Sequence, residues 1–464
     1  MRKTAAAVLW AVLAFPAWAQ APALPREADA DVDGDAKPER IVLEGTRDFV
    51  LRAGGAEARS SVTGRVLGLE LLDLDDPSTG KEVLVHAESP ERSPEVQLFR
   101  WKGGALERVP LPPGKPQASG SGIVLFDVPM GFWSRRDKYT YDAGKPGFSE
   151  VPQGLYFIHG ERHVFLLRET PLVSEPGGEL LLPLPAQTNP QLIAFAPDPG
   201  ARRESASSGW YLVEVDRLVG WVRGDAMTLN KPENRLDMWL DRDTSLYDVY
   251  SDTDLDGDGL GDSVSLERPE GTSPGALLIG NHRVKLPEHP DTKLQGVDLD
   301  FTDKYREIFL QGKKESRLVR FEGGAPRVVA LPGCDEFLFR GDSALMCVGR
   351  EYQEHKGGTV QRNRYFVFDK KQETFRERPQ SLYTHHVPKL DVKKTFPLLR
   401  SRDPKAPVVA RLAADSTIEV LVKSASDGHG RNWFLVLSQT GLLGWAEVDT
   451  VFKNVYPRRD DFEP

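Results

Sequence analysis

The stretch DLDGDGLGDSVSLER, residues 254–268, joins alternating aspartates and glycines to the start of an alternating apolar run. A related stretch, DVDGDAKPERIVLEG, occupies residues 31–45. Alternation of apolar and polar residues after each acidic run is the two-residue period of a half-buried β-strand. The chain therefore contains two copies of an acidic loop that leads into a strand.

Other segments of the chain repeat in the same order, about 220 residues later. The matching segments are 67–85 with 294–310, 98–112 with 318–332, 139–157 with 365–383, and 208–226 with 431–449. Matches that keep their order indicate an internal duplication. Short alternating apolar runs, together with 42 Gly and 35 Pro in 464 residues, predict strands and turns and no long helix. We therefore expect an all-β fold.

Each copy divides into a larger β-domain and a smaller barrel. The expected boundaries are 1–19 for a signal peptide, 26–165 and 246–390 for the β-domains, 166–228 and 391–455 for the barrels, and 229–245 for a linker. The linker region is rich in proline and charge, as linkers between domains tend to be.

The first residues predict export. Arg2 and Lys3 precede an apolar, alanine-rich stretch, and Ala17-Trp18-Ala19 supplies the small residues at a signal-peptidase site. No later apolar run reaches the roughly 18 residues that a membrane-spanning helix needs. We expect a periplasmic or secreted protein without a transmembrane anchor in the mature chain. The net charge of −9 argues against a nucleic-acid partner.

Cys334 and Cys347 are the only two cysteines of the chain. In an oxidising compartment, two cysteines this close in sequence are expected to close one disulfide. Two buried free thiols are the alternative. Neither cysteine has the sequence context of a catalytic thiol.

The acidic loops carry the residue types of a calcium site, because calcium takes about six to eight oxygen ligands, several of them carboxylates. In the second copy the expected ligands are the side chains of Asp254, Asp256, Asp258 and Asp262 and the carbonyl of Leu260. In the first copy they are the side chains of Asp31, Asp33, Asp35 and Glu39 and the carbonyl of Lys37. Ala36 stands where the second copy has a glycine, so we expect weaker binding there. An acidic turn without an ion is the alternative.

Two further acidic sets have matching spacing but lack the glycines. They are Asp73, Asp75 and Glu82 in the first copy and Asp298, Asp300 and Glu307 in the second. We interpret both as turns that do not bind an ion.

The acidic loops, each followed by a strand, resemble the FG-GAP/VCBS repeats of calcium-binding β-propellers. The resemblance extends over the two β-domains, is strongest at the loops, and implies blades of four strands. The two copies could combine into one ring, with the first barrel as an insertion. Alternatively, each copy could form its own β-sandwich-like domain.

The segments GWYLVEVDRLVGWV, residues 209–222, and NWFLVLSQTGLLGWAEV, residues 432–448, resemble the closing strands of bacterial SH3-like barrels. This resemblance implies binding to cell-wall peptides or a targeting role beside wall enzymes. Trp210 and Trp433 each begin a strand and are candidates for an aromatic ligand groove. Packing in the barrel core is the alternative for both.

No sequence motif of a hydrolase is present: there is no H-E-x-x-H and no G-x-S-x-G. We therefore expect a non-enzymatic cell-envelope binding or scaffold protein, whose two barrels face a peptidoglycan peptide or an envelope protein. The alternative is a hydrolase that acts on an envelope polymer from the face of a propeller.

Overall fold

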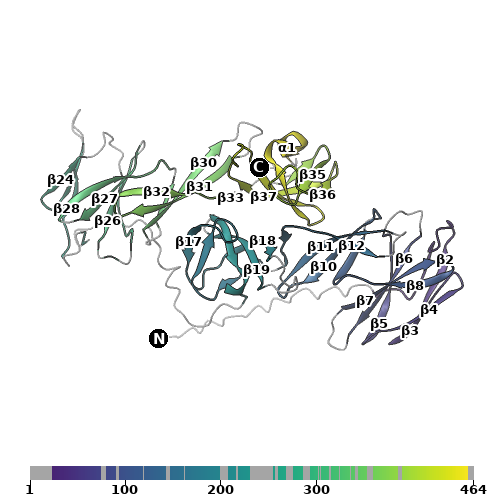
Figure 1. Ribbon diagram of the computed structural model, residues 1–464. Coiled ribbons are helices and arrows are strands. Elements are labelled where there is room, and N and C mark those ends of the chain that lie inside the picture. Colours follow the sequence, from purple (N-terminus) through teal and green to yellow (C-terminus); the bar gives the residue numbers. More distant parts are fainter. Residues whose placement is uncertain are drawn as a thin grey trace, which may run out of the picture. The chain divides into compact units, whose positions relative to one another are not determined.

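The computed structural model (Figure 1) describes residues 23–457 with gaps. The gaps are 75–79, 90–93, 119, 143–146, 161, 199–206, 216–217, 230–253, 256–259, 268–274, 286–292, 301–302, 304, 313–314, 323, 335, 340–342, 353–358 and 385–388. The expected signal peptide, nearly all of the linker, and Asp75, Asp256 and Asp258 lie outside the described residues. The chain forms two compact units, Met1–Phe126 with Lys138–Glu150, and Asp127–Asp137 with Val151–Pro464.

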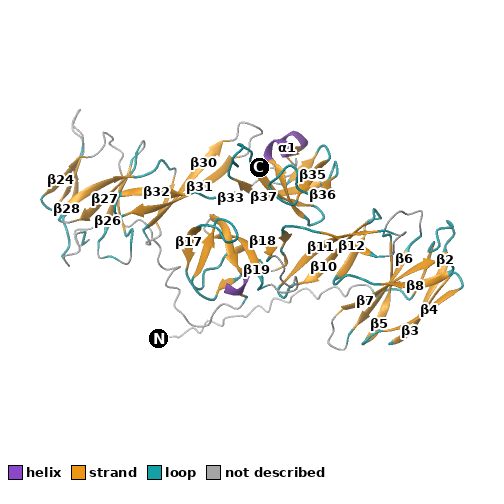
Figure 2. Cartoon of the chain, viewed as in Figure 1, coloured by secondary structure: helices purple, strands orange, loops and turns teal. Residues whose placement is uncertain are grey.

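Strands dominate the fold, as Figure 2 shows, so the expected all-β class is confirmed. In the described part of the chain, the helical elements are α1 (Val448–Asn454) and a single 3-10 turn (Gly224–Ala226). Among these described residues, no helix has the length and apolar character needed to cross a bilayer.

Each β-domain contains three antiparallel sheets in which consecutive strands are neighbours, and β14 (His159–Gly160) also pairs with β11 in the third sheet of the first copy. The sheets of the first copy are β1 (Glu27–Ala30), β2 (Glu39–Gly45), β3 (Asp48–Ala53) and β4 (Ala56–Ser61); β5 (Arg65–Leu72), β6 (Glu82–Glu88), β7 (Pro94–Lys102) and β8 (Ala105–Val109); and β9 (Lys115–Ala118), β10 (Ile123–Pro129), β11 (Trp133–Tyr141) and β12 (Phe148–Val151). Those of the second copy are β22 (Val264–Glu267), β23 (Ala276–Ile279) and β24 (His282–Lys285); β25 (Lys293–Val297), β26 (Glu307–Gln311), β27 (Arg317–Glu322) and β28 (Ala325–Ala330); and β29 (Glu336–Phe339), β30 (Ala344–Tyr352), β31 (Thr359–Asp369) and β32 (Thr374–Arg378).

The middle sheet of each copy is apolar on both faces. Val83, Leu84 and Val85 of β6 are all buried, and neighbouring side chains on a strand point to opposite faces. Val83 and Val85 pack against the first sheet, whereas Leu84 packs against the third. The same division recurs in β26, where the residues are Ile308 and Leu310 on one side and Phe309 on the other. The duplication seen in the sequence is therefore also a repeat of core packing.

Each barrel contributes five strands to one larger sheet that curves as a half-barrel. Barrel 1 has β16 (Thr170–Val173), β17 (Leu180–Leu184), β18 (Gln191–Pro197), β19 (Gly209–Val215) and β20 (Leu218–Arg223); barrel 2 has β35 (Phe396–Leu399), β36 (Val408–Leu412), β37 (Thr417–Ser424), β38 (Trp433–Ser438) and β39 (Leu443–Glu447). In both, the first strand pairs with the second and the fifth. Register shifts fall at equivalent places, between Leu192 and Ala194 in β18 and between Val420 and Val422 in β37.

The short strand β33 (Leu382–Thr384) joins the two barrels. Tyr383 pairs with Leu218 of β20 in barrel 1 and with Lys423 of β37 in barrel 2. Beside β33, the Ser381 hydroxyl donates a hydrogen bond of 2.6 Å to the carbonyl of Ser174 in barrel 1. The two barrels are therefore parts of one continuous sheet within the second unit.

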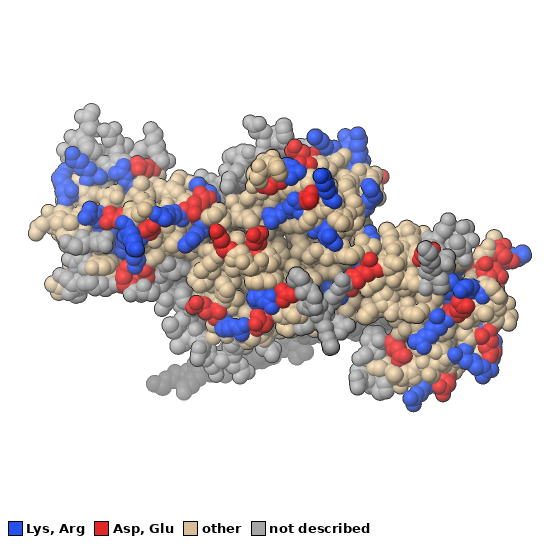
Figure 3. All heavy atoms as spheres, viewed as in Figure 1, with Lys and Arg blue, Asp and Glu red and all other residues tan. Residues whose placement is uncertain are grey.

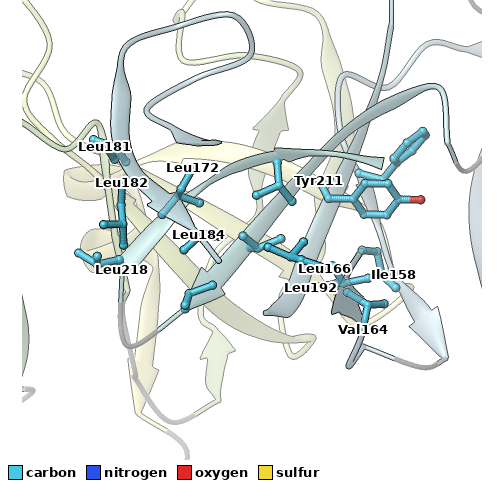
Figure 4. Close-up of a cluster of buried hydrophobic side chains, with 14 of the residues drawn as sticks. Ile158, Val164, Leu166, Leu172, Leu181, Leu182, Leu184, Leu192, Tyr211 and Leu218 are labelled. Atoms are coloured by element: carbon cyan, nitrogen blue, oxygen red, sulfur yellow. The ribbon is translucent and has the colours of Figure 1, made fainter. Parts of the chain in front are cut away.

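The core of barrel 1, shown in Figure 4, is closed by residues from outside the barrel. Trp133 of β11 donates from Nε1 to the Tyr211 hydroxyl at 3.1 Å, and its ring lies 5.3 Å from that of Phe195. Met346 and Tyr365, from the third sheet of the second copy, belong to the same buried cluster. Barrel 1 is thus packed against the start of β11 and against the third sheet of the second copy, all within the second unit.

The expected disulfide is confirmed. Cys334 and Cys347 are bonded, with 5.4 Å between their Cα atoms. Cys347 lies in β30 and is buried in the core between the second and third sheets of its copy, with Phe337 and Phe339. The bond therefore ties the segment before β29 to the neighbouring strand.

Candidate functional site

The four acidic loops share one hydrogen bond. In each, the apolar residue after the first aspartate is buried, and its backbone N–H donates to the last acid of the set. The pairs are Val32 to Glu39 at 2.9 Å, Leu74 to Glu82 at 3.3 Å, Leu255 to Asp262 at 2.8 Å, and Leu299 to Glu307 at 2.8 Å. The acid at the end of each set therefore has a structural role that the sequence spacing alone did not reveal.

The loop at Asp31 brings three of its expected ligands together. One carboxylate oxygen from each of Asp31, Asp33 and Glu39 lies within 4.8 Å of the others. The Asp31 carboxylate accepts hydrogen bonds from the N–H groups of Gly34 at 2.7 Å and Ala36 at 2.8 Å. Three converging carboxylates are the ligand type that a hard divalent cation takes.

Ala36 occupies the left-handed region, with φ of 65°. A non-glycine residue there costs about 1–2 kcal/mol. The equivalent position of the second copy is Gly259, which lies outside the described residues. Glycine adopts this conformation without that cost, so the alanine gives the first loop a backbone strain of its own.

Asp35 does not join the cluster. Its carboxylate accepts hydrogen bonds from the Lys37 backbone at 2.8 Å and from Lys37 Nζ at 3.1 Å. The hydrogen bond from the Lys37 backbone lowers the pKa of Asp35 below its ordinary value. Asp35 therefore hydrogen-bonds to Lys37, chiefly through the backbone, and is not among the converging carboxylates.

The loop at Asp254 is described only at its two ends. Asp254 is half-buried, Leu255 is buried, and the Asp262 carboxylate accepts the hydrogen bond from Leu255. Leu260 is an exposed residue. The hydrogen bond from the buried apolar residue to the last acid is therefore present in both loops.

The set at Asp298 is neutralised by the protein's own cations. Arg306 Nη1 lies 2.8 Å from Asp298, Lys370 Nζ lies 2.7 Å from Asp300, and Arg320 Nε lies 2.9 Å from Glu307. Burial raises the pKa of Glu307 to about 7, against the lowering effect of the Leu299 amide and Arg320. Basic residues of the protein therefore pair with each of the three acids of this loop in a salt-bridge network. Lys370 comes from the turn after β31, which the local spacing could not indicate.

The two candidate groove tryptophans have different surroundings. Trp433 is only 1% exposed and lies in a core shared by both barrels, with Trp221 and Trp445. Trp210 is half-buried at the edge of that core, and the Arg223 guanidinium lies 5.2 Å from its ring centre. Trp433 therefore has the packing role that was the alternative to a groove, and Trp210 is the candidate nearer to solvent.

Charged side chains are mixed over the face drawn in Figure 3. Lysine and arginine alternate with aspartate and glutamate there, without a large area of one sign.

Comparisons with known proteins add no family. No protein-family model matches the sequence, and no curated protein matches it. A crystal structure of a protein from Lactobacillus plantarum, a Northeast Structural Genomics Consortium target, aligns over 76% of this chain and 95% of its own. The sequences are 8% identical and the TM-score is 0.16, so this likeness carries no argument.

Proposed function

We propose that this chain is an exported, non-enzymatic scaffold and binding protein of the cell envelope, which attaches to peptidoglycan peptide. The pairing of β33 with both barrels is the observation that carries the scaffold role. It makes the two barrels one body with a shared core of tryptophans, instead of two modules on a flexible tether. A rigid body of this kind presents Trp210, the candidate nearer to solvent, in a fixed position, so that little conformational freedom is lost when a ligand binds.

Calcium at the Asp31 and Asp254 loops is part of the same proposal. The converging carboxylates of Asp31, Asp33 and Glu39 support it. Extracellular modules bind calcium at roughly 10⁻⁴ to 10⁻³ M. At free calcium of about 1 mM, each site would then stabilise the folded state by about 0.4–1.4 kcal/mol. Calcium would stiffen the loops and would not be required for folding.

The change Asp33→Asn tests the first loop. We expect it to lower the calcium-dependent gain in the free energy of unfolding by up to about 1 kcal/mol, because one ligand charge is lost. The measurement is urea denaturation in calcium and in EDTA. Asp48→Asn, at an exposed aspartate of β3, is the matched control. Equal calcium gains in the two variants would exclude ion binding by Asp33.

Co-sedimentation of residues 20–464 with purified peptidoglycan sacculi tests the proposed function. We expect the protein to pellet with sacculi, and Trp210→Ala to reduce the bound fraction about tenfold without unfolding the chain. Tyr456→Ala, at an exposed aromatic residue of β40 (Val455–Pro457), is the control. If the unaltered protein stays in the supernatant in both calcium and EDTA, peptidoglycan is not its ligand.

A further inference from the structure

A small pocket lies beside the Asp31 loop in the first unit. It has a volume of about 180 Å³. Its lining residues are Val32, Gly80, Lys81, Glu82, Arg100, Trp101 and Lys102. Pockets that enclose a whole small molecule usually measure about 300–1,000 Å³. This pocket therefore has room for the end of a larger ligand.

The lining is basic at its rim. Glu82 and Arg100 are only 3% and 8% exposed, and together they carry no net charge. Lys81 and Lys102 are exposed and add two positive charges. Lys102 Nζ lies 3.4 Å from Glu107, but both side chains are about half exposed, so this surface pair is weak. The half-buried Trp101 adds an aromatic surface.

The second copy differs at five of the seven lining positions, two of them conservatively, with Leu255 for Val32 and Arg306 for Lys81. Tyr305, Phe321 and Glu322 stand where the first copy has Gly80, Trp101 and Lys102. Phe321 is buried in the core between the first two sheets of its copy. The duplicate thus has a bulky residue in place of the glycine and an acid in place of the rim lysine.

The backbone at Gly80 requires glycine. Its φ is +92°, and a Cβ atom there would lie 2.7 Å from the Val32 carbonyl oxygen. The close approach keeps Gly80 against the Asp31 loop, and the Lys81 N–H donates to the Asp31 carbonyl at 2.8 Å. The close contact between Gly80 and the Asp31 loop therefore fixes the position of both the loop and the Gly80 side of the pocket.

We propose that this pocket binds the free carboxylate at the end of a peptide with small side chains. The two rim ammonium groups favour an anion, since Glu82 offsets the charge of Arg100 in the wall, and the volume suits a chain end. The Trp101 ring offers a surface for the last side chain. This inference rests on the proposed function and names the part of the wall peptide that is recognised.

The neighbouring acids give the binding a calcium dependence. Asp31, Asp33 and Glu39 lie next to the pocket through Val32, and their negative charges oppose an anionic ligand. A cation held by these acids would remove that opposition. We therefore expect weaker carboxylate binding in EDTA than in calcium.

The experiment is a titration of the mature chain, in calcium, with N-acetyl-D-alanyl-D-alanine and with its C-terminal amide. We expect saturable binding of the acid, and binding at least about tenfold weaker for the amide, which lacks the negative charge. Lys102→Glu introduces the residue of the second copy and is expected to weaken binding of the acid about tenfold. Lys115→Glu, at an exposed lysine of β9, makes the same charge change away from the pocket and is the control.

Three results would contradict carboxylate binding at this pocket: no saturable binding of the acid, equal binding of acid and amide, or equal effects of Lys102→Glu and Lys115→Glu. Trp101→Phe, also the residue of the second copy, gives a second test that changes no charge, and we expect it to weaken binding of the acid. Sacculus binding that survives while the acid fails to bind would leave the proposed function standing and remove only this site. If the unaltered protein fails to bind sacculi but still binds the acid, the pocket stands and the proposed function does not.

Discussion

Trp433→Ala is expected to lower the free energy of unfolding by about 3–5 kcal/mol, as large-to-small changes of buried aromatic residues do. The ring is 1% exposed and packs in the core that both barrels share, so its loss leaves a cavity at their junction. Because residues of barrel 1 such as Trp221 line the same core, the near-ultraviolet circular dichroism of both barrels should change. The measurement is urea denaturation followed by tryptophan fluorescence and circular dichroism.

Trp210→Ala is the matched control, because it removes the equivalent ring from the other copy. Trp210 is half-buried at the edge of the shared core, so its loss should cost less, about 1–2 kcal/mol. Equal losses for the two variants would mean that the barrels do not bury Trp433 against each other. That outcome would also remove the shared tryptophan core as support for the scaffold role.

The sequence alone could predict the class of fold but not the union of the barrels. Alternating apolar residues and the duplication predicted short strands in two matching copies. The spacing of Cys334 and Cys347 predicted the disulfide. The joining strand β33 has three residues, too few for a periodic pattern. Its partners, Leu218 and Lys423, are far away in the sequence, so only the folded chain brings them together.

The candidate sites were predictable where they depend on local spacing. The run of alternating acids grouped Asp31, Asp33 and Glu39 correctly. It could not show that Asp35 hydrogen-bonds to Lys37 and does not join the cluster. The pocket at Gly80 was missed because its residues come from three separate segments. A signal for it was nonetheless present, since Gly80 and Lys102 differ in size and charge from Tyr305 and Glu322 in an otherwise matching repeat.

A buried ion pair in β11 was also missed by reading the sequence, although its two residues are only two positions apart and so lie on one face of the strand. Arg135 Nε and Nη2 donate to the two carboxylate oxygens of Asp137 at 2.7 and 2.8 Å. The side chains are 3% and 5% exposed, and the guanidinium lies 5.1 Å from the centre of the Tyr156 ring. Both charges therefore depend on each other for compensation.

Arg135→Met is expected to lower the free energy of unfolding by about 3–5 kcal/mol, because it leaves the buried Asp137 carboxylate without its partner. The double variant Arg135→Met with Asp137→Leu removes both charges and should recover most of that loss, since replacing a buried ion pair by apolar residues is often neutral. Arg40→Met breaks the exposed pair with Glu27, at 2.6 Å, and should leave the free energy of unfolding nearly unchanged. Urea denaturation of the three variants measures these differences. A double variant as unstable as Arg135→Met would show that the loss comes from packing around the arginine and not from the abandoned charge.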